Sequence, residues 1–147
     1  MPAELDELDR QIVAELRRNA RLTNLELAGR VPLSHSAISR RIRRLEAEGV
    51  LRGYHAAVAP EALGETVRAF VAVQRAPTTP AIELAGALAG AEGVAGVWIL
   101  SGDFDVMIEI VARDMAQYSA IMLERVQTAP GVAATRSMFV LASVRER

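Results

Sequence analysis

The sequence predicts an α+β protein in two parts, an N-terminal winged helix-turn-helix unit and a C-terminal ferredoxin-like βαββαβ unit. Residues 5–49 carry apolar side chains at helical spacing, whereas residues 67–144 alternate β-rich runs with two helical runs. This change of pattern follows Pro60, where the chain also gains the turn residues of a linker. We therefore expect a helix-turn-helix domain at 1–60 and a second domain at 61–147.

The first helix is predicted between Asp6 and about Asn19. Asp6 is a suitable N-cap, and apolar residues recur at the spacing of one helix face, namely Leu5, Leu8, Ile12 and Leu16. The polar stretch that begins at Asn19 leads out of the helix. We expect this helix to pack across the two helices that follow it.

Two further helices are predicted on either side of Pro32. Thr23 and Glu26 have the spacing of a capping box that begins the first of them. Pro32 cannot donate a backbone hydrogen bond and disfavours helical geometry at Val31, so this helix is expected to stop there. Ser34 is the predicted N-cap of the next helix. A short helix, a tight turn and a longer helix form a helix-turn-helix, whose second helix enters the major groove of DNA.

The second helix of this motif has two distinct faces. At 3.6 residues per turn, the apolar residues from Ile38 to Leu45 share one side, and the opposite side carries Arg40 and Arg43 among small hydroxyl residues. Arginine-rich faces are often simply solvated, but the preceding turn and the small residues at the helix start favour DNA binding. The predicted DNA contacts, with Arg41 and Arg44 on phosphates, are Ser34, His35, Ser36, Ser39, Arg40, Arg41, Arg43 and Arg44.

The basic charge is concentrated in the first part of the chain. The net charge is only −1, and all 17 cationic side chains are arginine. Residues 1–60 hold ten arginines against eight acidic residues, whereas residues 61–147 hold seven arginines against ten. This distribution is expected of a protein that contacts DNA through one small unit.

After the helix-turn-helix, Tyr54, Ala56 and Val58 alternate with other residues, which predicts a small hairpin-like wing or a connecting strand. The rest of the chain predicts the order βαββαβ, with both helices on one face of an antiparallel sheet. The strands are expected at residues 67–74, 94–100, 105–111 and 132–144.

The two helices of this second part have recognisable beginnings. Thr79 is the predicted N-cap of the first, with Pro80 at its first helical position. Asp114 and Gln117 form a D-x-x-Q capping box that begins the second, which is expected to run through Val126.

Both faces of the predicted sheet carry apolar residues. Phe70, Trp98 and Met138 lie in opposite register to Val71, Val97 and Phe139, and the third predicted strand likewise has apolar residues in both registers, with Ile108 opposed to Met107. Two helices cover only one face, and an antiparallel sheet in a monomer normally keeps its other face in water. We therefore expect a homodimer in which a second copy covers the remaining face.

Taken together, these features resemble the Lrp/AsnC family of leucine-responsive, feast/famine transcriptional regulators. The resemblance covers about residues 5–144 and is strongest in the helix-turn-helix. It rests on L-D-E-L-D-R-Q-I at 5–12, R-L-T-N-L-E-L-A-G-R-V at 21–31, L-S-H-S-A-I-S-R-R-I-R-R-L-E-A-E-G-V-L-R-G-Y-H-A at 33–56, S-G-D-F-D at 101–105 and A-P-G-V-A-A-T-R-S at 129–137. Two positions depart from the usual family pattern, Pro32 at a common Gly and Ser137 at a common Thr.

The resemblance implies a winged helix-turn-helix joined to a ligand-sensing domain that pairs through its sheets, with dimers often assembling into octamers. It also implies that an amino acid or related metabolite binds in a cleft between dimers. The implied ligand residues are Gly102, Asp103, Asp105, Thr135 and Ser137. Their polar groups collect at the ends of otherwise apolar strands, where an Asp could hold an α-ammonium group.

The predicted function is sequence-specific transcriptional regulation in response to an amino acid or related small metabolite. The alternative is an architectural DNA-binding protein of the same fold without an effector, and a third reading is an enzyme or regulatory subunit of amino-acid metabolism. Asp103 and Asp105 have no matched base, and no metal, cofactor or nucleophile motif is present, so we do not expect catalysis. Without a signal peptide or an apolar span, the protein is expected in the cytoplasm and away from membranes.

Overall fold

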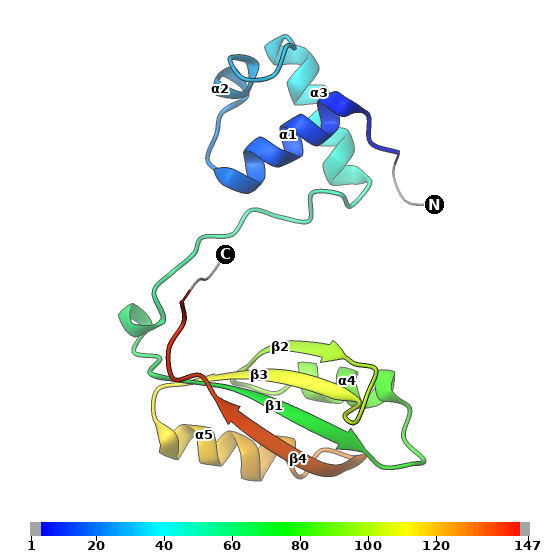
Figure 1. The fold of residues 1–147 in the computed structure, drawn as a ribbon, viewed down its shortest axis with the longest axis vertical. Coiled ribbons are helices and arrows are strands. Elements are labelled where there is room, and N and C mark those ends of the chain that lie inside the picture. Colours follow the sequence, from blue (N-terminus) through cyan, green and yellow to red (C-terminus); the bar gives the residue numbers. More distant parts are fainter. Residues whose placement is uncertain (1–3, 145–147) are drawn as a thin grey trace. The chain divides into compact units, whose positions relative to one another are not determined.

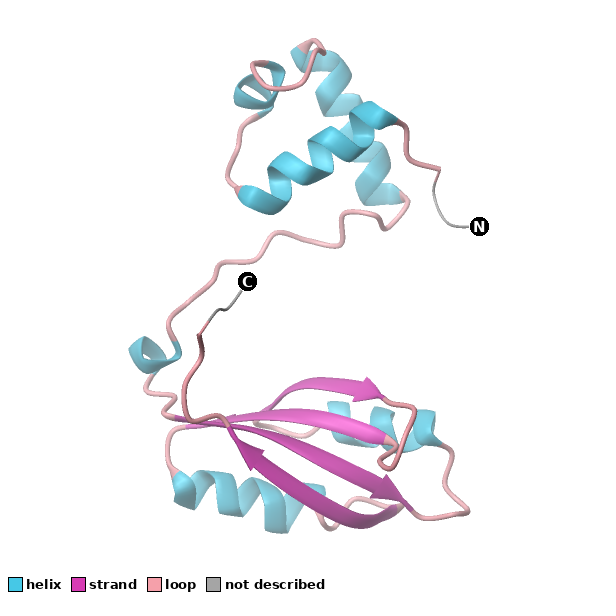
Figure 2. Ribbon diagram, viewed as in Figure 1, coloured by secondary structure: helices cyan, strands magenta, loops and turns pink. Residues whose placement is uncertain are grey.

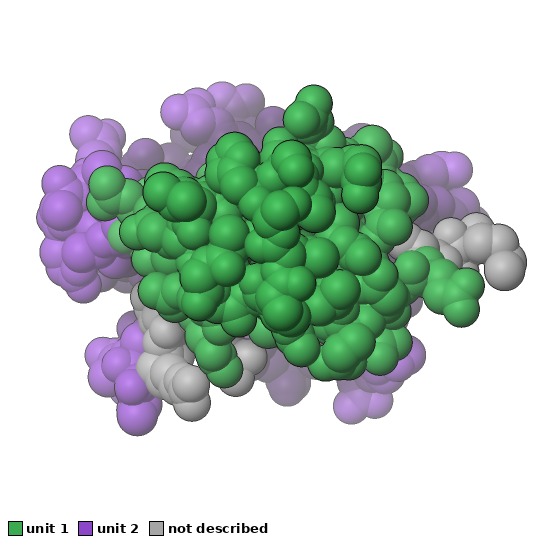
Figure 3. Space-filling view, turned by 90° about the horizontal axis from the view of Figure 1, so that it is seen from above, with its two compact units in different colours: residues 1–57 green, residues 58–147 purple. Residues whose placement is uncertain are grey.

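The computed structural model describes residues 4–144. The chain forms two compact units, and the division between them along the sequence falls between Ala57 and Val58 (Figures 1 and 3). Each unit has a hydrophobic core of its own. The predicted fold class is confirmed, with helices in the first unit and a sheet with helices in the second. The predicted domain boundary was placed at Pro60, slightly later than this division.

The first unit is built from α1 (Glu7–Arg18), α2 (Asn24–Ala28) and α3 (His35–Ala47). Asp6, Thr23 and Ser34 each accept a hydrogen bond from a backbone N–H of the following helix, so all three predicted N-caps are confirmed. The α2 helix ends at Ala28, with Gly29 as its C-cap, rather than at Val31 as predicted. Side chains from all three helices form the core, namely Ile12, Leu16, Leu22, Leu27, Val31, Ile38 and Leu45.

Protonation of Glu26 is expected to weaken α2 at acid pH. The backbone N–H and the hydroxyl of Thr23 donate to Glu26 Oε2 at 2.7 and 2.8 Å, and these bonds hold the pKa of Glu26 below its ordinary value. Because the folded pKa is depressed, the stabilisation is present above the unfolded pKa and is lost as the pH falls through the folded pKa. Glu26→Gln keeps an acceptor but cannot titrate. The melting temperature of Glu26→Gln should therefore lack the part of the acid destabilisation that sets in as the pH falls below 4.5, the ordinary pKa of Glu26, and parallel melting curves for the two proteins would contradict the prediction.

The chain after α3 forms neither a hairpin nor a connecting strand, the two structures predicted for the alternating residues around Tyr54. Gly49 turns the backbone with φ of 70°, and residues 52–59 then run as exposed chain without a strand or hairpin. Tyr54, Ala56 and Val58 are all exposed, so their alternation covers no apolar surface. This segment leads to the short 3-10 helix η1 (Pro60–Leu63) at the start of the second unit.

The second unit contains a four-stranded antiparallel sheet with strand order β2-β3-β1-β4. Figure 2 shows its helices on one face of the sheet. Its strands are β1 (Val67–Arg75), β2 (Val94–Ile99), β3 (Val106–Ala112) and β4 (Val132–Phe139), and its helices are α4 (Ala81–Ala89) and α5 (Met115–Ile121), which continues into the π-helical turn η2 (Met122–Val126). The predicted βαββαβ order is confirmed.

Three predicted details of this unit are wrong. The N-cap of α4 is Pro80 rather than Thr79, because the Pro80 carbonyl already accepts the N–H of Leu84 at 3.2 Å. Strand β4 ends at Phe139 rather than at residue 144. Asp114 caps α5 as predicted, but the Gln117 side chain accepts the N–H of Arg113 instead of completing a capping box.

The two faces of the sheet differ in composition. Side chains of β1 and β3 on the helical face, including Val71 and Ile108, are fully buried with α4 and α5. The outer face carries apolar residues that no helix covers, namely Phe70, Trp98, Met107 and Met138. It is not purely apolar as expected, because an Arg68–Glu109 ion pair and Arg136 lie among them.

Candidate nucleic-acid interface and ligand site

The start of α3 carries three of the predicted DNA contacts, Ser34, His35 and Ser36. At the start of α3, the Ser34 hydroxyl accepts the N–H of Ala37 at 3.3 Å and lies 3.2 Å from the hydroxyl of Ser36. His35 is exposed in the first turn. Ile38 and Leu45 are fully buried on the opposite side, so the predicted division of α3 into a core face and a polar face is confirmed.

Arg40 and Arg43 lie on the exposed face of α3. Among the described residues, Arg40 makes no hydrogen bond or ion pair, whereas Arg43 Nη2 donates to the hydroxyl of Ser39 at 3.0 Å. Both guanidinium groups are therefore carried outward by a helix whose other side is fixed in a core. This arrangement suits contact with base edges and phosphates in a DNA groove.

Arg41 and Arg44 lie against α1 instead. Arg41 Nη1 is 2.6 Å from Asp6 Oδ2 and 2.7 Å from Asp9 Oδ1, and Arg44 Nη2 donates to the second oxygen of Asp9. We call these four residues the carboxylate clasp. The bond from Arg41 holds the pKa of Asp6 below its ordinary value, and both carboxylates raise the pKa of Arg41. The clasp joins α1 to α3, and the phosphate contacts assigned to Arg41 and Arg44 stay a prediction.

The predicted ligand residues come from two places, the β2–β3 turn and β4, which Figure 1 shows. Gly102 has φ of 138°, a conformation that favours glycine, and both Gly102 and Asp103 are exposed. Asp105 accepts both the backbone N–H and the side-chain Nε of Arg75, at 3.0 and 2.9 Å. Asp105 thus anchors the turn to β1, whereas Asp103 is presented to solvent.

Thr135 and Ser137 occupy different positions along β4. Thr135 pairs with Val73, whose carbonyl also accepts the N–H of Asp105, so Thr135 lies in the row of residues next to the turn. Ser137 is two residues further on, which is roughly 7 Å along a strand. Its hydroxyl accepts the Tyr118 hydroxyl at 2.5 Å. The structure therefore brings Thr135 towards the turn and ties Ser137 to α5.

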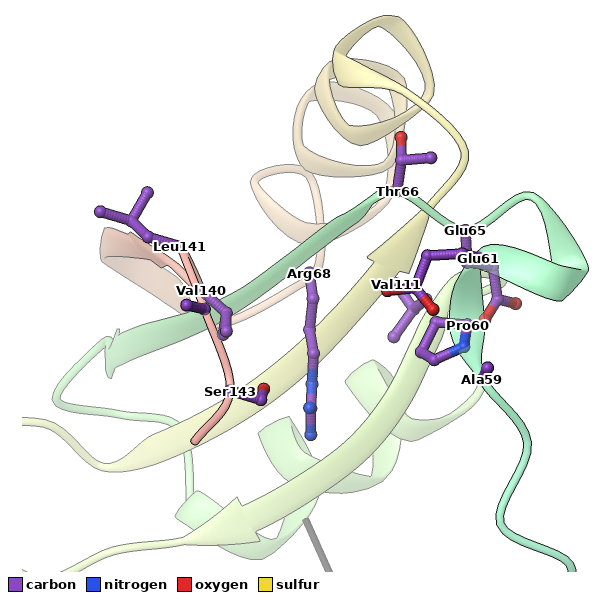
Figure 4. A pocket seen from close by; sticks show the side chains of 11 residues that line it. Ala59, Pro60, Glu61, Glu65, Thr66, Arg68, Val111, Val140, Leu141 and Ser143 are labelled. Atoms are coloured by element: carbon purple, nitrogen blue, oxygen red, sulfur yellow. The ribbon is translucent and has the colours of Figure 1, made fainter. Parts of the chain in front are cut away.

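A cavity lies at the end of the sheet opposite the β2–β3 turn. It measures about 420 Å³, and Figure 4 shows Arg68 between the η1 side chains and the chain that follows β4. Arg68 pairs with Val111 on β3, far along the strands from Val73 and Thr135. None of the predicted ligand residues lines this cavity.

Both units match family models. A model of winged helix-turn-helix DNA-binding domains matches residues 5–52, and a model of the Lrp/AsnC ligand binding domain matches residues 68–147, more than half of the chain. The chain belongs to the Lrp/AsnC family. It is a transcriptional regulator that combines a DNA-binding unit with a ligand-binding unit.

Relatives of this Lrp/AsnC protein match over nearly its whole length. The leucine-responsive regulatory protein of Salmonella typhimurium is 32% identical over 145 residues, which cover 97% of this chain and 88% of the relative. A transcriptional regulator of Neisseria meningitidis, solved in complex with L-Met, has a TM-score of 0.88 and 33% identity, with 97% and 94% of the two chains covered. A feast or famine regulatory protein of M. tuberculosis, solved with L-methionine, has a TM-score of 0.89 and 34% identity, with 97% and 96% covered.

These Lrp/AsnC relatives are regulators rather than enzymes. In the part of the chain that the structure describes, no helix is both long enough and apolar enough to span a membrane.

Three residues that organise the two sites of this Lrp/AsnC protein were not predicted from the sequence. Asp9 receives both clasp arginines, Arg75 anchors Asp105, and Tyr118 bonds Ser137. A signal for Asp9 was present, because it stands between Leu8 and Ile12 on the side of α1 that faces the core. Arg75 and Tyr118 have no comparable local signal.

Proposed function

We propose that this protein is a cytoplasmic regulator that reads duplex DNA with the exposed face of α3 and changes its affinity for DNA when an amino acid binds the second unit. The exposed Arg40 and Arg43 opposite a buried helix face carry the first half of the proposal. An arginine can donate two hydrogen bonds to a guanine edge, and Ser36 and Ser39 can contact bases or phosphates beside it.

The effector is proposed to bind beside the β2–β3 turn, with Gly102, Asp103, Asp105, Thr135 and Ser137 around it. The solved relatives that hold L-methionine support an amino acid as the ligand class. Asp103 suits the α-ammonium group because it is exposed and has no hydrogen bond or ion pair to another described residue. Asp105 instead holds the turn in place through Arg75, so that the backbone of Gly102 can approach the ligand.

Asp103→Ala is expected to weaken amino-acid binding by about tenfold to about a hundredfold, because a hydrogen bond to a charged group contributes about 1.5–3 kcal/mol. Calorimetry of the full-length protein with each common L-amino acid measures this effect. Glu83→Ala is the matched control, since it removes an exposed carboxylate from α4.

Binding that Asp103→Ala leaves unchanged would contradict this placement and direct attention to the cavity of Figure 4. If no amino acid binds the unaltered protein, the effector proposal fails and the architectural function becomes the better one. An effector that binds should change DNA affinity by a modest coupling free energy of about 1–3 kcal/mol.

The outer face of the sheet is proposed as the contact between two copies. Phe70 and Trp98 lie with ring centroids 6.4 Å apart, and Trp98 and Met138 remain 46% and 43% exposed in the single chain. Gly96 makes room for the Trp98 ring, because a Cβ at Gly96 would lie 2.3 Å from it. An aromatic and methionine cluster with polar groups among it is typical of a protein interface. Paired α3 helices would then reach half-sites about one helical turn of DNA apart, or a multiple of that spacing.

A further inference from the structure

The carboxylate clasp contains the one charged side chain that is fully buried among the described residues. The Asp9 side chain is 1% exposed and bonds a guanidinium group with each of its oxygens. Asp6 lies at the rim, with half of its side chain exposed, and bonds the same nitrogen of Arg41. Two carboxylates of α1 therefore face two guanidinium groups of α3, and their charges cancel.

This cancellation matters because α3 is a helix with four arginines in five positions. Non-specific DNA affinity depends on how many phosphates a protein neutralises, whatever the base sequence. Specificity is the ratio between specific and non-specific binding, so an arginine that contacts phosphates on every sequence does not improve the ratio. Arg40 and Arg43 are exposed and do not bond the clasp carboxylates, whereas the clasp holds the side chains of Arg41 and Arg44, which are 21% and 43% exposed.

We propose that Asp6 and Asp9 withhold Arg41 and Arg44 from DNA phosphates, which lowers non-specific affinity and leaves discrimination to Arg40 and Arg43. This inference rests on the proposed DNA-reading face of α3. Asp6 and Asp9 are positioning residues in this scheme, because they act on DNA only through the arginines that they hold. The role adds to the joining of α1 to α3 and explains why acidic residues stand beside a DNA-binding surface.

Asp6→Asn separates the charge of Asp6 from its role as an N-cap. The Asp6 carboxylate accepts the N–H of Asp9 at 2.8 Å, and an asparagine oxygen caps a helix about as well as an aspartate oxygen. The α1 helix should therefore begin as before, while Arg41 loses one of its two anionic partners. Far-ultraviolet circular dichroism checks that the helix content is unchanged.

The readout is binding to a duplex without an operator, measured by fluorescence anisotropy at several salt concentrations. In Asp6→Asn, the logarithm of the binding constant should fall more steeply with the logarithm of salt, by up to about 0.9, the value for one more neutralised phosphate. The affinity of Asp6→Asn for this duplex, divided by that of the unaltered protein, should therefore be on the order of threefold larger at about 50 mM salt than at about 200 mM. The ratio of operator to non-operator affinity should fall.

Glu7→Gln is the matched control for the loss of one negative charge. Glu7 is the exposed neighbour of Asp6 in the first turn of α1, and its carboxylate accepts a hydrogen bond from Gln11 Nε2 rather than from an arginine. This variant should leave the salt slope unchanged. Arg41→Gln provides a second test, since it should leave the slope of the unaltered protein unchanged and should return the slope of Asp6→Asn to its original value.

Equal slopes for Asp6→Asn and Glu7→Gln would overturn the inference. Weaker non-specific binding of Asp6→Asn would also overturn the inference. That result would mean that the intact clasp positions its arginines for a phosphate, at the hollow of about 310 Å³ that Arg40, Arg41 and Arg44 line. Failure of the proposed DNA-reading face would give a different result, namely that specific operator binding survives the loss of Arg40 and Arg43.

Discussion

The double variant Arg40→Ala, Arg43→Ala is expected to lose sequence-specific DNA binding while keeping its fold. Both side chains are exposed, and the core face of α3 beneath them is formed by Ile38 and Leu45. Each base-reading arginine contributes about 1–3 kcal/mol to discrimination, so the pair should cost about 2–6 kcal/mol of specific binding. The measurement is anisotropy with the protein's own promoter fragment in competition with a scrambled duplex.

Arg10→Ala with Arg17→Ala is the matched control, because it removes two exposed arginines of α1 from the same unit. The control should reduce affinity on both duplexes to a similar extent and keep the ratio between them. A double variant of Arg40 and Arg43 that still prefers the promoter fragment would show that another surface reads the bases.

Charge on the outer face of the sheet is expected to convert the proposed dimer into a monomer. Trp98→Glu with Met138→Glu places two carboxylates where two apolar faces would meet, and a tryptophan at the centre of an interface alone commonly contributes about 2 kcal/mol or more. That corresponds to roughly a thirtyfold weaker association, before the cost of burying the new charges. Light scattering at micromolar protein measures the change, and specific DNA affinity should fall with it because paired α3 helices are lost.

Ile82→Glu tests which face is used. Ile82 is 70% exposed on α4, on the helical side of the sheet, so the same change there should leave the dimer intact. A stable dimer in the Trp98 and Met138 variant, together with a monomer in Ile82→Glu, would move the contact to the helices.

Most of the fold could be predicted because its signals are local. The capping side chains of Asp6, Thr23 and Ser34 mark helix starts within three residues, and apolar spacing separates helices from strands. Predictions failed where a longer-range contact decides the outcome. An alternating pattern around Tyr54 looks like a strand, but a strand needs a partner, and no neighbouring segment pairs with it in the described chain.

The candidate sites were predicted as sets of residues but not as arrangements. Helical spacing places Arg40 and Arg43 opposite the core face of α3, but it does not show that Asp9, more than thirty residues earlier, bonds both Arg41 and Arg44. Asp105 likewise looks equivalent to Asp103 until Arg75 is placed beside it. Which members of a charged cluster remain exposed depends on tertiary packing, which spacing along the chain does not encode.

The exposed stretch of residues 52–59 also bears on how regulators of this kind diversify. Neither hydrophobic core includes a side chain from this stretch, and insertions in such a chain cost little free energy. A genetic crossover within this stretch would join the first unit of one regulator to the second unit of another and leave both hydrophobic cores intact. Operator choice and metabolite choice can therefore change separately over evolutionary time, each through substitutions on its own side of the junction.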